Sequence, residues 1–106
     1  MTSRRRTPRT ADVSLNRSHA HRRTYGDVAY GWAMEDTTGF CKVLAEPGTG
    51  RLLGAHIMGP QAPTLIQSLV LAATLGIDAT TLAKSPYWIH PALTEVVENA
   101  LLDLDL

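Results

Sequence analysis

The sequence of 106 residues has a single cysteine, Cys41. One thiol excludes an internal disulfide, a Cys-x-x-Cys redox pair and a cysteine-based zinc cluster within this chain. The neighbourhood of Cys41 is apolar and has no cluster of cations, which predicts a buried strand residue rather than a reactive thiol. A lone cysteine also suits a reducing compartment, so we expect a cytoplasmic protein.

Long apolar runs and short catalytic signatures are absent as well. No stretch approaches the roughly 18–20 apolar residues that a membrane-spanning helix needs, and the basic N-terminus lacks the apolar core of a secretory signal. The sequence has no dinucleotide-binding GxGxxG, no nucleotide-binding P-loop, no zinc-binding HExxH and no serine-nucleophile GxSxG motif. We therefore expect no membrane partner, no bound metal and no cofactor held by this chain alone.

The net charge of zero conceals two oppositely charged segments. Residues 1–23 carry seven arginines and one acid, whereas residues 24–106 carry three basic residues and nine acids. The first segment has no helical or strand period, so we predict a disordered arginine-rich arm at 1–23 and one folded domain at 24–106. Nothing aromatic is interleaved in the arm for base stacking, so binding of nucleic acid through it is a remote alternative. Its composition is also typical of GC-rich DNA translated out of frame, which suggests a truncated or frame-shifted fragment.

Beyond the arm, the pattern predicts strands followed by helices. Three strands are expected, with short turn sequences between them that favour an antiparallel meander, at 27–34, 40–46 and 51–59. Such segregated runs predict an α+β fold with an antiparallel sheet of about three strands.

Three helices are expected after the strands. The apolar period of 3.6 residues predicts a helix at 62–75 with Gly76 as its C-terminal cap. Asp78 is the expected N-cap of a short helix at about 79–84. A last helix is predicted to start near Pro91, a favourable first residue.

His90 and Glu95 form the one constellation with catalytic potential. A carboxylate bound to one imidazole nitrogen fixes the tautomer and leaves the other nitrogen to donate or accept a proton. The alternative role is structural: His90 packs near the start of the last helix, and Glu95 interacts with the positive end of the helix dipole. Spacing alone favours the structural role, because the pair stands without a third group.

The other histidines and the tryptophans give weaker signals. We interpret His56 as a strand residue with satisfied hydrogen bonds, because a metal site would need ligands that the sequence does not supply. His19 and His21 belong to the predicted arm, where no metal-binding pair is expected. Trp32 and Trp88 are expected to anchor the core or an interface.

Two segments, TGRLLGAHIMGPQAPTLIQ at 49–67 and YWIHPALTEVVENALL at 87–102, resemble the C-terminal dimerisation domain of the flavin-dependent pyridine nucleotide-disulfide oxidoreductases. Within that family, the second segment and YGDVAYGWAMEDTTG resemble the mycothione reductases most. The resemblance covers residues 24–106. It implies a fold like that of the FAD/NAD-linked reductase dimerisation domains, and it implies a second copy or a full-length reductase subunit as partner.

The resemblance also implies site residues. In this family the histidine of the His-Pro motif reaches the partner subunit's active site and acts as acid/base toward a redox cysteine pair, held by a glutamate. This implies His90 as the acid/base, Glu95 as its orienting partner and a cis His90–Pro91 peptide bond. The family's FAD and NADPH sites and its Cys-x-x-x-x-Cys pair have no counterpart in this sequence, so we expect the chain to be inactive alone.

The family's domain begins with a strand and a helix ahead of the matching stretch. The arginine-rich arm stands in their place, so we expect a domain that is incomplete on its N-terminal side, with an unpaired sheet edge that invites association. The alternative to a severed enzyme is a stand-alone module that homodimerises or caps a reductase subunit. The apolar faces of the helices expected at 62–75 and 91–104 favour that alternative.

Overall fold

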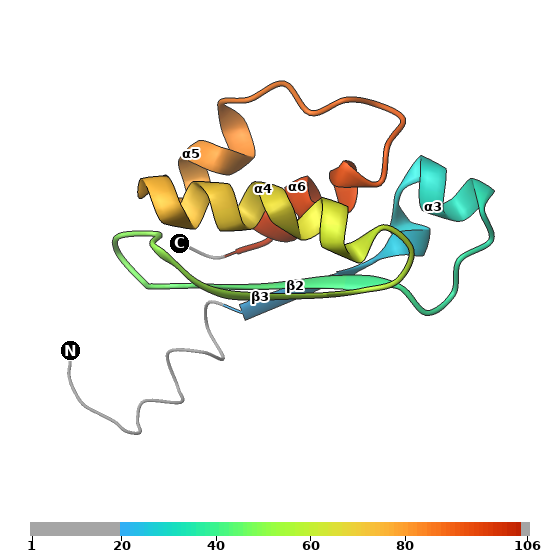
Figure 1. Cartoon of the computed structure of the whole chain (residues 1–106), viewed down its shortest axis with the longest axis horizontal. Coiled ribbons are helices and arrows are strands. Elements are labelled where there is room, and N and C mark those ends of the chain that lie inside the picture. The colour runs from blue at the N-terminus through green and yellow to red at the C-terminus, as the bar shows by residue number, and fades with distance from the viewer. Residues whose placement is uncertain (1–19, 105–106) are drawn as a thin grey trace.

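The computed structural model describes residues 20–104, which form a small sheet with helices on one side (Figure 1). Strands β1 (Ala20–Thr24), β2 (Phe40–Ala45) and β3 (Leu52–Met58) pair antiparallel in the order β1-β2-β3. The predicted α+β class and the meander are confirmed. The second and third predicted strands are also confirmed, to within one residue at each end.

The strand predicted over 27–34 is wrong. The 3-10 helix η1 (Tyr25–Asp27) and the short helix α3 (Ala29–Ala33) occupy that segment. Apolar residues alternate there as in a strand, but they do not share one buried face: Val28 is buried, whereas Trp32 is 75% exposed. Trp32 is therefore not a core residue.

Strand β1, which replaces the wrongly predicted strand in the sheet, comes from the segment that was predicted to be a disordered arm. Each residue of β1 has a partner in β2. On the helix side of the sheet, Arg23 Nε lies 3.0 Å and His21 Nε2 lies 3.4 Å from Oδ2 of Asp103. The prediction of disorder is therefore wrong for residues 20–23, because backbone pairing and a distant carboxylate hold this polar strand. The remaining residues of the predicted arm, 1–19, lie outside the described part of the chain.

Three helices cover one face of the sheet (Figure 1). Helix α4 (Ala62–Leu75) packs against β3, α6 (Thr94–Leu102) packs against β1 and β2, and α5 (Ala79–Lys84) packs against α6. Buried aliphatic side chains of β2 and the three helices form one core, in which Val43 of β2 and Val96 and Val97 of α6 are fully buried. Partly buried side chains of β3 pack against this core. The core thus lies between the sheet and the helices.

The helix caps follow the predicted pattern. Helix α4 has the predicted bounds and ends at Gly76, whose φ of 74° is the left-handed conformation that glycine adopts without strain. The side chain of Asp78 accepts the backbone N–H of Thr81 at 3.1 Å and caps α5. Local sequence therefore sets the bounds of these two helices.

Helix α6 begins at Thr94, three residues after the predicted start at Pro91. The His90–Pro91 peptide bond is cis, as the resemblance implied. The carboxylate of Glu95 accepts the backbone N–H of Ala92 at 3.3 Å, and the Glu95 N–H donates to the Ala92 carbonyl at 3.3 Å. This reciprocal pair of hydrogen bonds satisfies the backbone N–H of Ala92, which precedes α6. The first turn of α6 therefore lies beyond Pro91.

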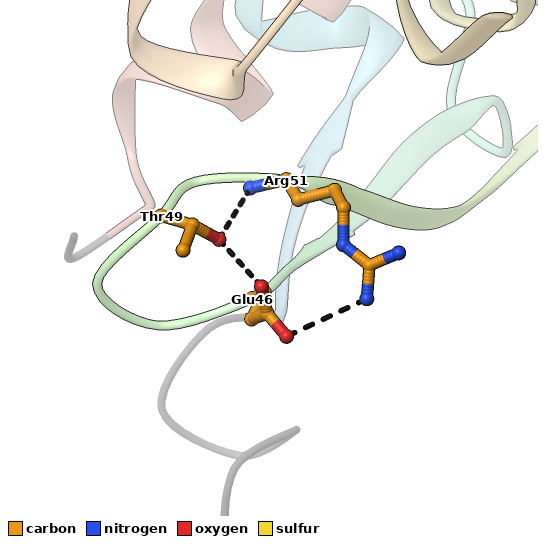
Figure 2. Close-up of polar contacts among 3 residues, drawn as sticks. All are labelled: Glu46, Thr49 and Arg51. Atoms are coloured by element: carbon orange, nitrogen blue, oxygen red, sulfur yellow. Dashed lines mark hydrogen bonds and ion pairs between the residues drawn. The ribbon is translucent and has the colours of Figure 1, made fainter. Parts of the chain in front are cut away.

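A polar cluster closes the connection between β2 and β3 (Figure 2). The hydroxyl of Thr49 donates to Glu46 Oε1 at 2.6 Å, and Arg51 Nη2 donates to Glu46 Oε2 at 3.5 Å. These bonds, the one from Thr49 first, lower the pKa of Glu46 below its ordinary value. The Gly50 carbonyl accepts the N–H of Ala79, so the hairpin also holds the start of α5.

Tyr25 is fully buried and joins three separate segments. Its hydroxyl donates to the Pro60 carbonyl at 2.8 Å, and its backbone N–H donates to the Gly39 carbonyl at 2.8 Å. A Cβ atom on Gly39 would lie 2.6 Å from the tyrosine ring, and one on Gly59 would lie 2.9 Å from it. The ring is therefore enclosed by backbone that only glycine permits, an arrangement that sequence patterning did not identify.

Candidate functional site

His90 and Glu95 meet at the start of α6. Nδ1 of His90 lies 2.8 Å from Oε1 and 2.9 Å from Oε2 of Glu95, so one ring nitrogen faces both oxygens of the carboxylate. The backbone of Ala92 holds the same carboxylate. The contact between the two predicted site residues therefore exists, with the glutamate fixed from a second direction.

The two side chains differ in exposure. The side chain of Glu95 is 18% exposed, whereas that of His90 is 64% exposed. Within residues 20–104 no hydrogen bond reaches Nε2 of His90. An Nδ1–H that donates to the carboxylate leaves Nε2 as the ring nitrogen that can gain or lose a proton. The geometry is that of an oriented imidazole able to exchange a proton at Nε2.

A second carboxylate lies one helical turn further along α6. Burial, and then the charge of Glu95, raise the pKa of Glu98 above its ordinary value. The environment of Glu98 therefore favours its protonated form, and the carboxylate in contact with His90 is that of Glu95.

Exposed apolar side chains surround the approach to His90. Tyr87 is 84% exposed and Ile89 is 59% exposed, although both precede the site directly. Between them Trp88 packs on the core and donates its indole N–H to the Leu82 carbonyl at 3.2 Å. Tyr87 also lines an apolar depression of about 280 Å³ together with Leu71 of α4. An apolar surface of this kind around a polar group is typical of a protein interface.

Apart from His90 and Glu95, the described residues form no second reactive site from the thiol of Cys41 or from acidic side chains. Cys41 is buried in β2, and this burial raises the pKa of its thiol to about 12. The thiol therefore stays protonated near neutral pH and is inert, as the sequence predicted. Within residues 20–104, no group of three or more His, Cys, Asp and Glu side chains is placed to hold a metal ion.

His56 lies on the predicted third strand, β3. Its side chain is exposed and points away from the helices, and within the described residues no other side chain or backbone group forms a hydrogen bond with its ring. Among the helices of residues 20–104, none is long and apolar enough to cross a membrane.

The glycine turn between β2 and β3 does not fit a dinucleotide. The N–H of Gly50 is already bound by the Glu46 carbonyl at 2.9 Å, and that of Arg51 by Thr49 Oγ1 at 3.2 Å. The carboxylate of Glu46 at the same turn would repel a pyrophosphate (Figure 2). The described residues therefore offer no phosphate cradle for FAD or NADPH at this turn.

Comparison with known proteins places the chain in a family. The sequence profile described as "Pyridine nucleotide-disulphide oxidoreductase, dimerisation domain" matches residues 11–101. The chain belongs to this dimerisation-domain family. The family resemblance stated from the sequence is thereby confirmed, and the match starts ahead of the predicted domain boundary at residue 24.

Individual relatives agree with this family. Mycothione reductase of Mycobacterium tuberculosis is 66% identical over 80 residues, which cover 76% of this chain and 17% of the relative. Dihydrolipoyl dehydrogenase of Corynebacterium glutamicum is 40% identical over 67 residues, or 63% of this chain and 14% of the relative. The crystal structure of LpdA from Mycobacterium tuberculosis has the same fold, with a TM-score of 0.73 at 23% identity over 78% of this chain and 18% of that one. The chain thus spans less than a fifth of each of these proteins.

Proposed function

We propose that this dimerisation domain belongs to a mycothione-reductase-like flavoprotein disulfide reductase and supplies His90 as the acid/base for a partner subunit's active site. One observation carries the proposal: Glu95 holds Nδ1 of His90 at 2.8 and 2.9 Å, while 64% of the His90 side chain is exposed. The 66% identity to a mycothione reductase supports the choice of parent enzyme.

In this proposal the chemistry of the chain is proton transfer at one atom. Nε2 of His90 takes a proton from a thiol of the partner subunit as that thiol becomes a nucleophile, and it returns a proton to a leaving thiolate. Glu95 stabilises the imidazolium formed in the first step and keeps the ring in one orientation. Glu95 is therefore a positioning residue, because it acts through His90.

The cofactors belong to the parent enzyme in this proposal. FAD and NADPH would supply the electrons when the complete enzyme is assembled, and the turn between β2 and β3 offers neither of them a phosphate cradle. The inert thiol of Cys41 is no substitute for a redox cysteine pair. We therefore propose that the chain alone does not turn over, and that it acts in the reducing cytoplasm where such disulfide reductases work.

The proposed partner is a second copy or a full-length reductase subunit. The exposed apolar side chains of Tyr87 and Ile89 beside His90, and of Leu71 and Leu75 on α4, support a surface that a subunit covers. The same surface supports the second candidate function, a stand-alone module that homodimerises or caps a reductase subunit. Neither function uses nucleic acid.

A chimera tests the proposal. Residues 20–104 replace the homologous segment of the Mycobacterium tuberculosis mycothione reductase, and NADPH-dependent reduction of mycothiol disulfide is measured. We expect turnover of the same order as that of the unmodified reductase, and none from the chain alone with added FAD and NADPH.

Flavin absorbance shows whether the chimera binds flavin, and sedimentation shows whether it is a dimer. A chimera that is dimeric and binds flavin, yet shows no turnover, would contradict the proposed acid/base role. Turnover by the chain alone would contradict the claim that the parent enzyme holds the cofactors. A chain that dimerises stably while the assembled chimera fails would favour the stand-alone module.

A further inference from the structure

The sheet has one covered and one uncovered face. Helices α4, α5 and α6 lie on one side of it (Figure 1), and the side chains of Cys41 and Val43 point into the core on that side. Phe40 and Lys42, which alternate with them along β2, point the other way. Within residues 20–104, no helix or strand covers this second face.

A row of three basic side chains crosses the uncovered face. Arg22 of β1 lies opposite Lys42 of β2, and Lys42 lies opposite His56 of β3. Like charges directly opposite one another on neighbouring strands are destabilising. The Arg22–Lys42 pair therefore weakens the isolated sheet, and an anionic partner would relieve the repulsion between these two cations.

No carboxylate in the described residues neutralises this row. On the covered side, Arg23 pairs with Asp27 and Asp103, and at the hairpin Arg51 pairs with Glu46. None of the ion pairs found within residues 20–104 includes Arg22 or Lys42. Within residues 20–104, Arg23 and Arg51 are thus paired with carboxylates, whereas Arg22 and Lys42 on the uncovered face are not.

Apolar surface lies beside the basic row. The three basic residues line an open depression of about 850 Å³ together with Ala20, Phe40 and Met58. The guanidinium carbon of Arg22 stands 4.1 Å from the centroid of the Phe40 ring, and Met58 is 59% exposed. An apolar floor with cations across its middle is complementary to carboxylates set between aliphatic side chains.

We propose that the uncovered face of the sheet binds an acidic amphipathic segment of polypeptide. The carboxylates of the segment pair with Arg22, Lys42 and His56, and its aliphatic side chains pack on Phe40 and Met58. This occupant leaves the proposed acid/base site free, because α6 with Glu95 lies on the other side of the sheet.

Two features of the face disfavour nucleic acid as its occupant. The guanidinium of Arg22 already lies over the phenyl ring of Phe40, so that ring is not free for a base to stack on. The phosphates of a nucleic acid backbone would also make no use of the apolar floor at Met58.

A titration with a synthetic peptide tests the proposal. The probe is a 14-residue helical peptide with glutamates along one stripe and leucines beside them, added to the full chain labelled with ¹⁵N. We expect the amide signals of Arg22, Lys42 and His56 to shift on binding. Lys42→Glu should weaken binding by about tenfold or more, because it reverses the charge at the centre of the row. Lys42→Glu should fold, because the new carboxylate lies opposite Arg22 and His56.

Lys84→Glu is the matched control, since it makes the same change of charge on the exposed end of α5. We expect it to leave peptide affinity within about twofold of the unmodified chain. Equal weakening by both variants would overturn the proposal, as would undiminished binding by Lys42→Glu. Tighter binding of inorganic tripolyphosphate than of the peptide would identify a phosphate-binding face instead. Self-association that Lys42→Glu abolishes in the absence of peptide would make a second copy the occupant.

Discussion

His90→Gln should lower kcat of the chimeric reductase by about 10²–10⁴-fold, which is the usual effect of losing a positioned acid–base group. Glutamine keeps a polar side chain of similar reach but cannot take up a proton at the position of Nε2. The loss should appear mainly in kcat, because the imidazole is proposed to act on the thiols and not to bind substrate. Steady-state kinetics with mycothiol disulfide as the varied substrate measure this effect.

Glu95→Gln should give a smaller loss, because His90 remains present but loses the charge that stabilises its protonated form. Its profile of kcat against pH should move, which a purely structural role for Glu95 would not cause. Glu98→Gln is the control, since it removes a carboxylate from the same helix without touching the imidazole. If His90→Gln remains dimeric, binds flavin and keeps kcat within about threefold of the chimera, general acid–base catalysis by His90 is excluded.

Tyr25→Ala should destabilise the domain by about 3–5 kcal/mol, the usual cost of deleting a large buried ring. That is a large share of the stability of a small domain, about 5–15 kcal/mol. The ring fills a space bounded by Gly39 and Gly59, and its hydroxyl satisfies the Pro60 carbonyl. Tyr25→Phe should cost about 1 kcal/mol, because only the hydrogen bond is lost.

Urea unfolding followed by circular dichroism measures both effects. Tyr87→Ala is the matched control, because it deletes the same side chain where 84% of the residue is exposed. We expect the control to change the free energy of unfolding by no more than about 0.5 kcal/mol. A similar, small effect of Tyr25→Ala would show that Tyr25 does not join the segments around it.

The dependence of domain stability on alkaline pH should also show the contribution of Tyr25. Burial first, and then the charge of Asp36, raise the pKa of Tyr25 above its ordinary value. The unfolded chain therefore releases the phenolic proton at a lower pH than the folded chain does. The contribution of Tyr25 is fully present at neutral pH and is lost as pH rises above about 10. Tyr25→Phe should remove that part of the alkaline loss.

Local sequence was sufficient where local forces decide the structure. The apolar period of α4, the glycine that ends it and the Asp78 cap all act within a few residues. Helix α4 was therefore predicted with its observed bounds. Strands β2 and β3 were also predicted, because short turns separate them and one face of β2 is buried.

Non-local contacts account for what sequence patterning missed. Strand β1 is polar and reads as part of a solvated arm, because its partner Asp103 lies at the far end of the chain. Tyr25 joins Gly39 and Pro60, which no period within the sequence connects. Alternation within β3 also does not tell which face of the sheet the helices cover, so the exposure of His56 was not predicted.

The candidate site was predicted only in part from the spacing of its residues. Spacing brought His90 and Glu95 within reach of each other but favoured a structural role. The resemblance to a family supplied the thiol partner that the chain does not contain. The structure adds the contact of both Glu95 oxygens with Nδ1 and the exposure of the His90 side chain. The role of the pair is a proposal that only an assembled enzyme can test.

A mixed dimer tests most directly whether His90 acts across the subunit interface. One chimeric subunit carries His90→Gln and keeps its redox cysteines, and the other keeps His90 and has those cysteines replaced by serine. If His90 serves the partner's thiols, one of the two sites in the mixed dimer is complete, and about half of the activity of the unmodified chimera returns. If His90 serves its own subunit or has no catalytic role, the mixed dimer is no more active than the two parent variants, and the proposed function fails.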